Sequence, residues 1–147
     1  MIYKEDSILI SKDLTSVFQV ARDIENLSNF IPEYKNVKCL DGKNEEIILE
    51  AKIQLLGLIP TTFISSGVIK ENESIKYKQI KGPVKGLQTE WRFEKIDKKT
   101  KLSIIHDLNI KIPLIGRLIE RLVYALFLRN LAKEVLLCMK KKLEENP

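Results

Sequence analysis

The feature that most constrains the fold of this chain is a long run of period-two hydrophobic alternation that ends in one helical pattern. Successive side chains of a strand point to opposite faces, so alternation marks strands that bury a single face. The pattern predicts six consecutive strands, at Tyr34–Leu40, Glu45–Leu56, Thr61–Lys70, Ser74–Ile80, Leu87–Ile96 and Lys101–Lys111. Asp41-Gly42 is predicted to form the first turn, and Gly57 and Pro60 to interrupt the chain after the second strand. Because the turns are short, we expect an antiparallel meander with one apolar face.

The flanking segments supply the cover that such a sheet needs. Ile2–Ile10 is predicted to form a further strand, and two short helices follow it at Leu14–Asp23 and Glu25–Phe30. Asp13 is placed to cap the first helix by accepting hydrogen bonds from free backbone N–H groups. Leu114–Glu144 is helical throughout and is the only element large enough to cover the sheet. We therefore expect an α+β fold, in which a curved antiparallel sheet of about seven strands wraps around a long C-terminal helix and leaves a cavity.

Composition restricts the chemistry of the chain. Its 147 residues are expected to make one domain, residues 1–147. One histidine and two cysteines cannot supply the roughly four ligands of a structural zinc site. The scattered glycines form no nucleotide-binding motif, so neither a metal nor a cofactor is expected. A polar start, the lack of a long uncharged apolar stretch and two cysteines far apart in the sequence predict a cytoplasmic protein.

The net charge of +5 is concentrated in one segment. Lys70–Lys101 holds ten basic and five acidic residues, and the rest of the chain holds fifteen of each. A surplus of this kind fits an anionic partner such as nucleic acid, anionic lipid or an acidic ligand. Lysines on the solvent face of strands produce the same surplus, and here they alternate with Ile75, Tyr77, Trp91 and Phe93. We therefore place the lysines on outer strand faces and do not favour nucleic acid or the ribosome as a partner.

The long helical pattern changes its apolar face part-way along. At about 100° per residue, the apolar stripes of its two halves point in directions that differ by roughly 100–130°. The first stripe is Ile115, Leu118, Ile119, Leu122 and Leu126, and the second is Leu128, Leu131, Ala132, Val135, Leu136 and Met139. Either the helix bends near Tyr124–Arg129, or its first half packs under the apolar loop Leu55–Thr62 or contacts the cavity mouth, a second subunit or a membrane surface. Arg117 and Arg121 beside the first stripe fit an anionic membrane.

Two short motifs are similar to those of a known superfamily. Asp23, Glu25, Phe30, Pro32 and Tyr34 match a D-x-E-x-x-x-x-F-x-P-x-Y/C pattern that follows a helix containing Val-Phe. Near the C-terminus, TEWRFEK gives a W-x-F strand, followed by a turn, another strand and an apolar entry into the last helix. Over nearly its whole length the chain resembles the polyketide cyclase/dehydrase and coenzyme Q-binding branch of the START/birch-pollen-allergen (SRPBCC) superfamily.

The resemblance implies a helix-grip fold, with two short helices closing one end of the sheet and a hydrophobic ligand in the cavity. Members of the superfamily include sterol and lipid carriers, coenzyme Q-binding proteins, aromatase/cyclases of polyketide synthesis and a toxin-like branch that acts on ribosomes. One fold thus hosts both binders and enzymes. Tyr34 stands where the quinone-binding and ribosome branches often carry cysteine, so the resemblance selects neither branch.

Alternation turns a mixed set of side chains toward the expected cavity. A mostly apolar wall with a few polar groups is typical of a ligand site. We expect ligand contacts from Trp91, Phe93, Tyr77, Phe63, Thr89, Gln79, His106, Leu118 and Leu122, although aromatic side chains on a sheet face also serve as core. His106, between Ile104 and Leu108, is the one candidate for a general base. A nucleophilic pair of Cys39 and His106 requires that the two lie close together.

Three functions fit these observations, in order of preference. The first is binding or transport of a hydrophobic small molecule: an isoprenoid quinone, a lipid or a polyketide-like aromatic compound. The second is an aromatase/cyclase or dehydratase acting on a polyketide-like substrate, for which His106 needs a polar partner at the cavity. The third is a ribosome-associated, toxin-like role with steeply salt-dependent binding. The first is favoured because one histidine and two distant cysteines offer little catalytic chemistry.

Overall fold

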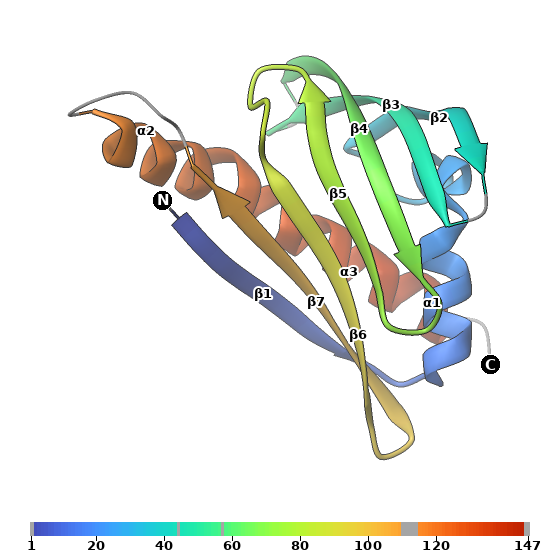
Figure 1. Ribbon diagram of the computed structural model, residues 1–147. Helices are drawn as coiled ribbons and strands as arrows, with labels where there is room; N and C mark the ends of the chain where they lie inside the picture. The colour runs from blue at the N-terminus through green and yellow to red at the C-terminus, as the bar shows by residue number, and fades with distance from the viewer. Residues whose placement is uncertain (1, 44, 57, 110–114, 146–147) are drawn as a thin grey trace.

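The alternating segments form a curved antiparallel sheet that packs against one long C-terminal helix (Figure 1). The computed structural model describes residues 2–43, 45–56, 58–109 and 115–145. Its strands are β1 (Ile2–Ile10), β2 (Tyr34–Lys43), β3 (Glu46–Leu55), β4 (Ile59–Lys70), β5 (Ser74–Lys81), β6 (Gln88–Ile96) and β7 (Lys99–Leu108). Their order in the seven-stranded sheet is β1-β7-β6-β5-β4-β3-β2. Strands β2 to β7 therefore form the predicted meander, and β1 pairs with the last strand.

Two short helices separate β1 from β2, and a long helical stretch follows β7. These elements are α1 (Leu14–Arg22), the 3-10 helix η1 (Ile24–Asn29), α2 (Gly116–Val123), the π-helical η2 (Tyr124–Leu128) and α3 (Arg129–Glu145). Asp13 caps α1 as predicted, because its side chain accepts a hydrogen bond from the Ser16 N–H at 3.1 Å. The predicted α+β helix-grip fold, with its long C-terminal helix and two short helices after the first strand, is confirmed.

The core lies between the sheet and helices α1 and α3. Val17, Phe18 and Ala21 share one face of α1 and are buried. The Phe18 ring packs edge-on against Phe93 of β6, with ring centroids 5.1 Å apart. The buried face of α3 consists of Ala132, Val135, Leu136, Met139 and Leu143. Phe93 thus belongs to the core beneath α1.

Two of the predicted strand ends are wrong. Asp41-Gly42 was expected to turn, but β2 continues through both residues and a bulge after Cys39 takes up the extra residue. Pro60 was expected to interrupt the strand, yet it is the second residue of β4 and is paired with Gln54 of β3. Proline is tolerated this close to the start of a strand. Gly57, the predicted strand end at Lys111 and the predicted helix start at Leu114 lie outside the described residues.

A π-helical turn lies where the sequence predicts a change of face in the long helix. The Arg129 N–H donates to the Tyr124 carbonyl, which is an i→i+5 bond. Buried positions recur every fourth residue through this region, at Gly116, Glu120, Tyr124, Leu128 and Ala132. An α-helix has about 3.6 residues per turn, so the wider π turn offsets part of the drift that a spacing of four produces. Four residues of the first apolar stripe face solvent instead, since Ile115, Leu118, Leu122 and Leu126 are each about half exposed. Its fifth residue, Ile119, is half-buried.

Candidate functional site

A cavity of about 380 Å³ lies between the sheet and the C-terminal helix. Small-molecule sites commonly occupy roughly 300–1,000 Å³. The helical wall is made by Val123, Phe127, Leu128, Leu131, Ala132 and Val135. The sheet contributes the inward residues of β2 to β7, because these recur at every second position, and Ile24 and Leu27 of η1 close one end. The wall is largely apolar, so the cavity suits an apolar ligand.

Six of the side chains predicted to contact a ligand line this cavity: Phe63, Tyr77, Gln79, Thr89, Trp91 and His106. The strand register explains how they come together. Tyr77 of β5 lies opposite Thr89 of β6, which lies opposite His106 of β7. These three side chains therefore form one row across the sheet. Their contact with a ligand stays a prediction.

Three further predicted residues lie outside the cavity wall. Phe93 is on the same strand and the same face as Thr89 and Trp91. It lies beneath α1, however, where its ring packs against Phe18 and not against the cavity. Leu118 and Leu122 lie on the exposed side of α2, with 59% and 50% of each residue exposed. The prediction assumed that the apolar stripe of a helix is its buried face. In α2 the buried face is instead the one that carries Gly116 and Glu120. Val123 and Phe127 occupy the wall in their place.

Cys39 is exposed on β2, whereas His106 is on β7. Four strands, β6 to β3, lie between these two strands in the sheet. A Cys39–His106 pair is therefore excluded. Cys138 is half-buried on α3, packed against the core.

His106 is the one imidazole of the chain, and it is buried in the cavity wall with 4% of the residue exposed. Burial lowers the pKa of His106 from 6.5 to about 4, and the charge of Asp6 opposes this only in part. The imidazole is thus neutral at pH 7. Its Nδ1 atom has no hydrogen-bond partner among the described residues. A neutral ring with a free nitrogen can take part in one hydrogen bond with a polar group of a ligand.

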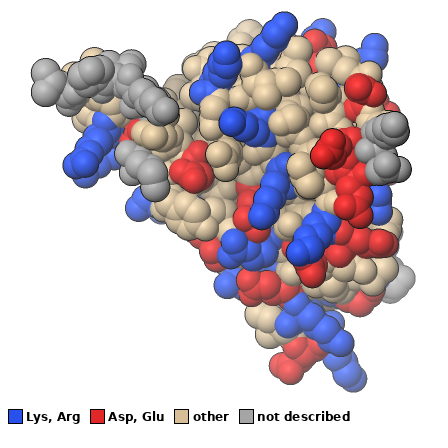
Figure 2. Space-filling view, in the orientation of Figure 1, with Lys and Arg blue, Asp and Glu red and all other residues tan. Residues whose placement is uncertain are grey.

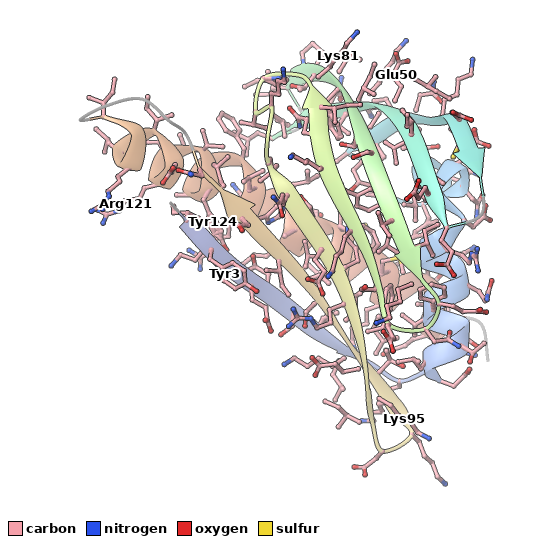
Figure 3. The ribbon with its side chains drawn as sticks, in the orientation of Figure 1. Tyr3, Glu50, Lys81, Lys95, Arg121 and Tyr124 are labelled. Carbon is pink, nitrogen blue, oxygen red and sulfur yellow. The ribbon has the colours of Figure 1, made fainter. Side chains whose placement is uncertain are left out.

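The π turn is fixed to the first strand next to this histidine. The hydroxyl of Tyr124, which Figure 3 labels, donates a 2.7 Å hydrogen bond to the Asp6 carboxylate of β1. Burial and this bond raise the pKa of Tyr124 to about 12. The rings of Tyr124 and His106 meet edge to face, with centroids 6.5 Å apart. Tyr124 thus holds η2 at a fixed position above the cavity.

Gln79 has a structural role besides lining the cavity. Its side-chain oxygen accepts a 2.8 Å hydrogen bond from the Val84 N–H, and its backbone bonds to Gly86 and Leu87. Val84 and Leu87 themselves line the cavity. Gln79 therefore keeps the β5–β6 loop folded over the cavity.

Sequence reasoning did not place Tyr34, Thr61 and Ser65 in the wall, and the structure does. Burial raises the pKa of Tyr34 and of Tyr77, so both phenols keep their protons at neutral pH. Thr61 and Ser65 stand two residues before and after Phe63, so alternation along the strand was the signal that could have assigned them to the face of Phe63. Tyr34 entered the analysis only through the family motif.

The outer face of the sheet carries lysines mixed with acidic residues (Figure 2). Lys76 and Lys78 are exposed, and Arg92 pairs with Glu90 at 2.9 Å. In residues 2–43, 45–56, 58–109 and 115–145, no group of three His, Cys, Asp or Glu side chains could hold a metal ion. Within the same residues, no helix is both long and apolar enough to cross a bilayer.

Residues 10–133 match the model of the family described as polyketide cyclase/dehydrase and lipid transport. The chain belongs to this family. Among curated protein sequences, none matches the chain significantly. Solved structures resemble it in fold, and their low sequence identities limit the comparison to the fold.

Three solved structures illustrate this likeness. The protein TTHA0849 from Thermus thermophilus has 14% identity and a TM-score of 0.83, with 98% of both chains covered. The Zhui aromatase/cyclase from Streptomyces sp. R1128 has 14% identity and a TM-score of 0.81, covering 98% of this chain and 94% of that one. A START superfamily protein from Mycobacterium smegmatis has 15% identity and a TM-score of 0.80, with 99% of both covered.

Proposed function

We propose that the protein binds and carries a hydrophobic small molecule in the cavity between its sheet and its C-terminal helix. The observation that supports this most is the cavity itself, which has about 380 Å³ of space and a largely apolar wall. Each methylene group that a ligand buries there contributes about 0.8 kcal/mol. The family description, which includes lipid transport, agrees with such a role.

The cavity volume limits the size of the ligand. An apolar cavity of about 150 Å³ takes up benzene, which corresponds to about 25 Å³ per non-hydrogen atom. On that scale, 380 Å³ holds about 15 non-hydrogen atoms. An aromatic compound of about three fused rings, or a single alkyl or prenyl chain of that length, fits entirely. A long isoprenoid quinone or a two-chain lipid would place only a part of itself inside.

The polar groups of the wall select the chemistry of that ligand. His106, Thr89 and Ser65 lie among apolar neighbours, and the free Nδ1 of His106 has no partner among the described residues. A ligand with one hydroxyl or carbonyl oxygen near this nitrogen satisfies it, whereas a pure hydrocarbon leaves it unsatisfied. We therefore favour an apolar molecule with one polar end.

Native mass spectrometry of the purified protein, followed by solvent extraction, tests the proposal. We expect a bound apolar compound of about the size given above, or uptake of added 1-naphthol or 1-decanol at one molecule per chain. A protein that carries no such compound and takes up neither probe would contradict a binding function.

An aromatase/cyclase or dehydratase is the second candidate. One observation favours it: an imidazole with a free nitrogen lines a cavity that fits an aromatic substrate. A pKa of about 4 makes His106 a weak base at neutral pH, so we rank this function second. Turnover of a poly-β-ketone thioester that His106→Gln abolishes, while 1-naphthol binding persists, would support it. Equal product formation with and without the protein would contradict it.

A further inference from the structure

Helix α2 turns its apolar side chains outward and its one acidic side chain inward. A surface helix ordinarily buries its apolar stripe and exposes its charges. In α2, Glu120 is 1% exposed, whereas Leu118 and Leu122 are 59% and 50% exposed. Ile115 and Leu126 extend the exposed stripe at either end. This arrangement leaves four large apolar side chains facing out from the protein.

The charges beside this stripe are all positive. Arg117, Arg121 and Arg129 are exposed, and Figure 3 shows Arg121 pointing away from the body of the protein. Between Ile115 and Arg129 the sequence holds no acidic residue other than Glu120, whose carboxylate is buried. The exposed side of this part of the helix therefore combines leucines with an excess of positive charge.

A second exposed apolar segment borders the same cavity. Leu56, Leu58 and Ile59 lie at the turn between β3 and β4, and Leu58 is 81% exposed. Ile59 also lines the cavity, as Val123 of α2 and Phe127 of η2 do. Both exposed apolar segments are thus continuous with the cavity wall.

We infer that these two segments form a docking face for the surface of an anionic lipid bilayer. The docking face consists of Ile115, Leu118, Leu122 and Leu126 with Arg117 and Arg121, together with Leu56, Leu58 and Ile59. Its leucines enter the boundary between headgroups and acyl chains, as those of interfacial helices do. Its arginines extend toward the lipid phosphates, with which they form bidentate hydrogen bonds. The inference goes beyond ligand binding, because it concerns the surface by which the protein docks on another structure.

Charge favours a bilayer over a second copy of the chain. A symmetric dimer that buries the leucines would bring the same face of both copies together. Arg117 and Arg121 of one copy would then lie near those of the other, and α2 exposes no acidic side chain to compensate them. Like charges placed together in this way oppose association. An anionic bilayer supplies both the apolar layer and the negative charge.

Vesicle co-sedimentation of the full chain tests the inference. We expect binding to phosphatidylcholine vesicles that contain phosphatidylserine, weaker binding to phosphatidylcholine alone, and release by salt. Leu118→Ala/Leu122→Ala removes half-exposed side chains worth about three buried methylenes in total, so it should weaken binding roughly 50-fold. Arg117→Gln/Arg121→Gln should weaken binding to the anionic vesicles about 30-fold and change binding to the neutral ones little.

Matched variants elsewhere on the surface serve as controls. Leu40→Ala/Leu137→Ala changes two leucines with 48% and 55% exposure outside the docking face, and Lys95→Gln/Lys98→Gln removes two exposed charges from the β6–β7 hairpin. Both should bind vesicles like the unchanged protein. The inference is overturned if the control variants lose as much binding as the docking-face variants. It is also overturned if the protein binds neither kind of vesicle. A protein that sediments as a dimer, which Leu118→Ala/Leu122→Ala dissociates, would overturn it too. Native mass spectrometry of the bound ligand, repeated on each variant, separates loss of docking from loss of ligand binding.

Discussion

Filling the cavity at Ser65 should shorten the longest ligand that the protein holds. Ser65 is 4% exposed and lines the cavity from β4. Ser65→Phe adds about five non-hydrogen atoms, or about 125 Å³ at 25 Å³ per atom. Because the cavity has about 380 Å³, its capacity should fall from about 15 to about 10 non-hydrogen atoms.

A series of primary alkanols measures this capacity directly. With the unchanged protein, each added methylene should lower the Kd about fourfold, which corresponds to about 0.8 kcal/mol. The affinity should stop rising when the alkyl chain of the alkanol fills the cavity, at about 14 carbon atoms and one oxygen for 25 Å³ per atom. In Ser65→Phe it should stop about five carbons earlier, so the longest alkanols lose about 4 kcal/mol, or nearly 1,000-fold in Kd.

Ser66→Phe is the matched control. Ser66 is the next residue of β4 and points to the opposite face of the sheet, so this variant should bind the series like the unchanged protein. Isothermal titration calorimetry gives each Kd, and circular dichroism confirms that both variants are folded. An identical cut-off in Ser65→Phe and Ser66→Phe would refute the assignment of the cavity as the ligand site.

Three other predictions concern stability. The folded protein keeps His106 neutral, so the part of the free energy of unfolding that depends on this side chain is fully present above pH 6.5 and is lost as the pH falls toward about 4. Urea unfolding should show that, over this range, the free energy of unfolding falls by about 3 kcal/mol more in the unchanged protein than in His106→Gln. Tyr124→Phe removes the bond to Asp6 and should lower the free energy of unfolding by about 1.5 kcal/mol, and an unchanged urea midpoint would contradict that role. Gly82→Ala places a Cβ 2.7 Å from that of Phe63 at a φ of +139°, which should cost about 2 kcal/mol and lower the thermal midpoint. Gly42→Ala is the control, because its Cβ meets Ile47 Cγ2 at an ordinary 3.5 Å and its φ is not positive.

The sheet could be predicted from the sequence because its signal is local. Alternation fixes which face each strand buries, and the turns fix which strands are neighbours. Tyr77, Thr89 and His106 were therefore assigned to one face before their register was known, and the structure places them in one row. The bulge after Cys39 was missed, since an extra residue in a strand leaves the hydrophobic pattern almost unchanged.

The helical wall of the cavity could not be predicted in the same way. Sequence periodicity locates an apolar stripe but does not say that the stripe is buried. In α2 the rule fails, because Glu120 takes the buried position and Leu118 and Leu122 do not. The apolar residues that do reach the cavity from this part of the helix, Val123 and Phe127, depend on a helical geometry that periodicity at 100° per residue does not represent.

The π turn also means that the deletion of a single residue would change which face of α2 is exposed. Deleting the exposed Ala125 would convert η2 into a regular α-helical turn and rotate α2 by about 100° relative to α3. Each residue of α2 would then move into the place of the residue that follows it. Ile119 would take the buried position of Glu120, Leu122 would take the cavity position of Val123, and Glu120 would reach solvent. The longer turn therefore determines which of two amphipathic helices the same sequence presents. In a chain shortened by one residue, Arg117 and Arg121 would occupy the exposed positions of Leu118 and Leu122, so this side of the helix would be charged instead of apolar.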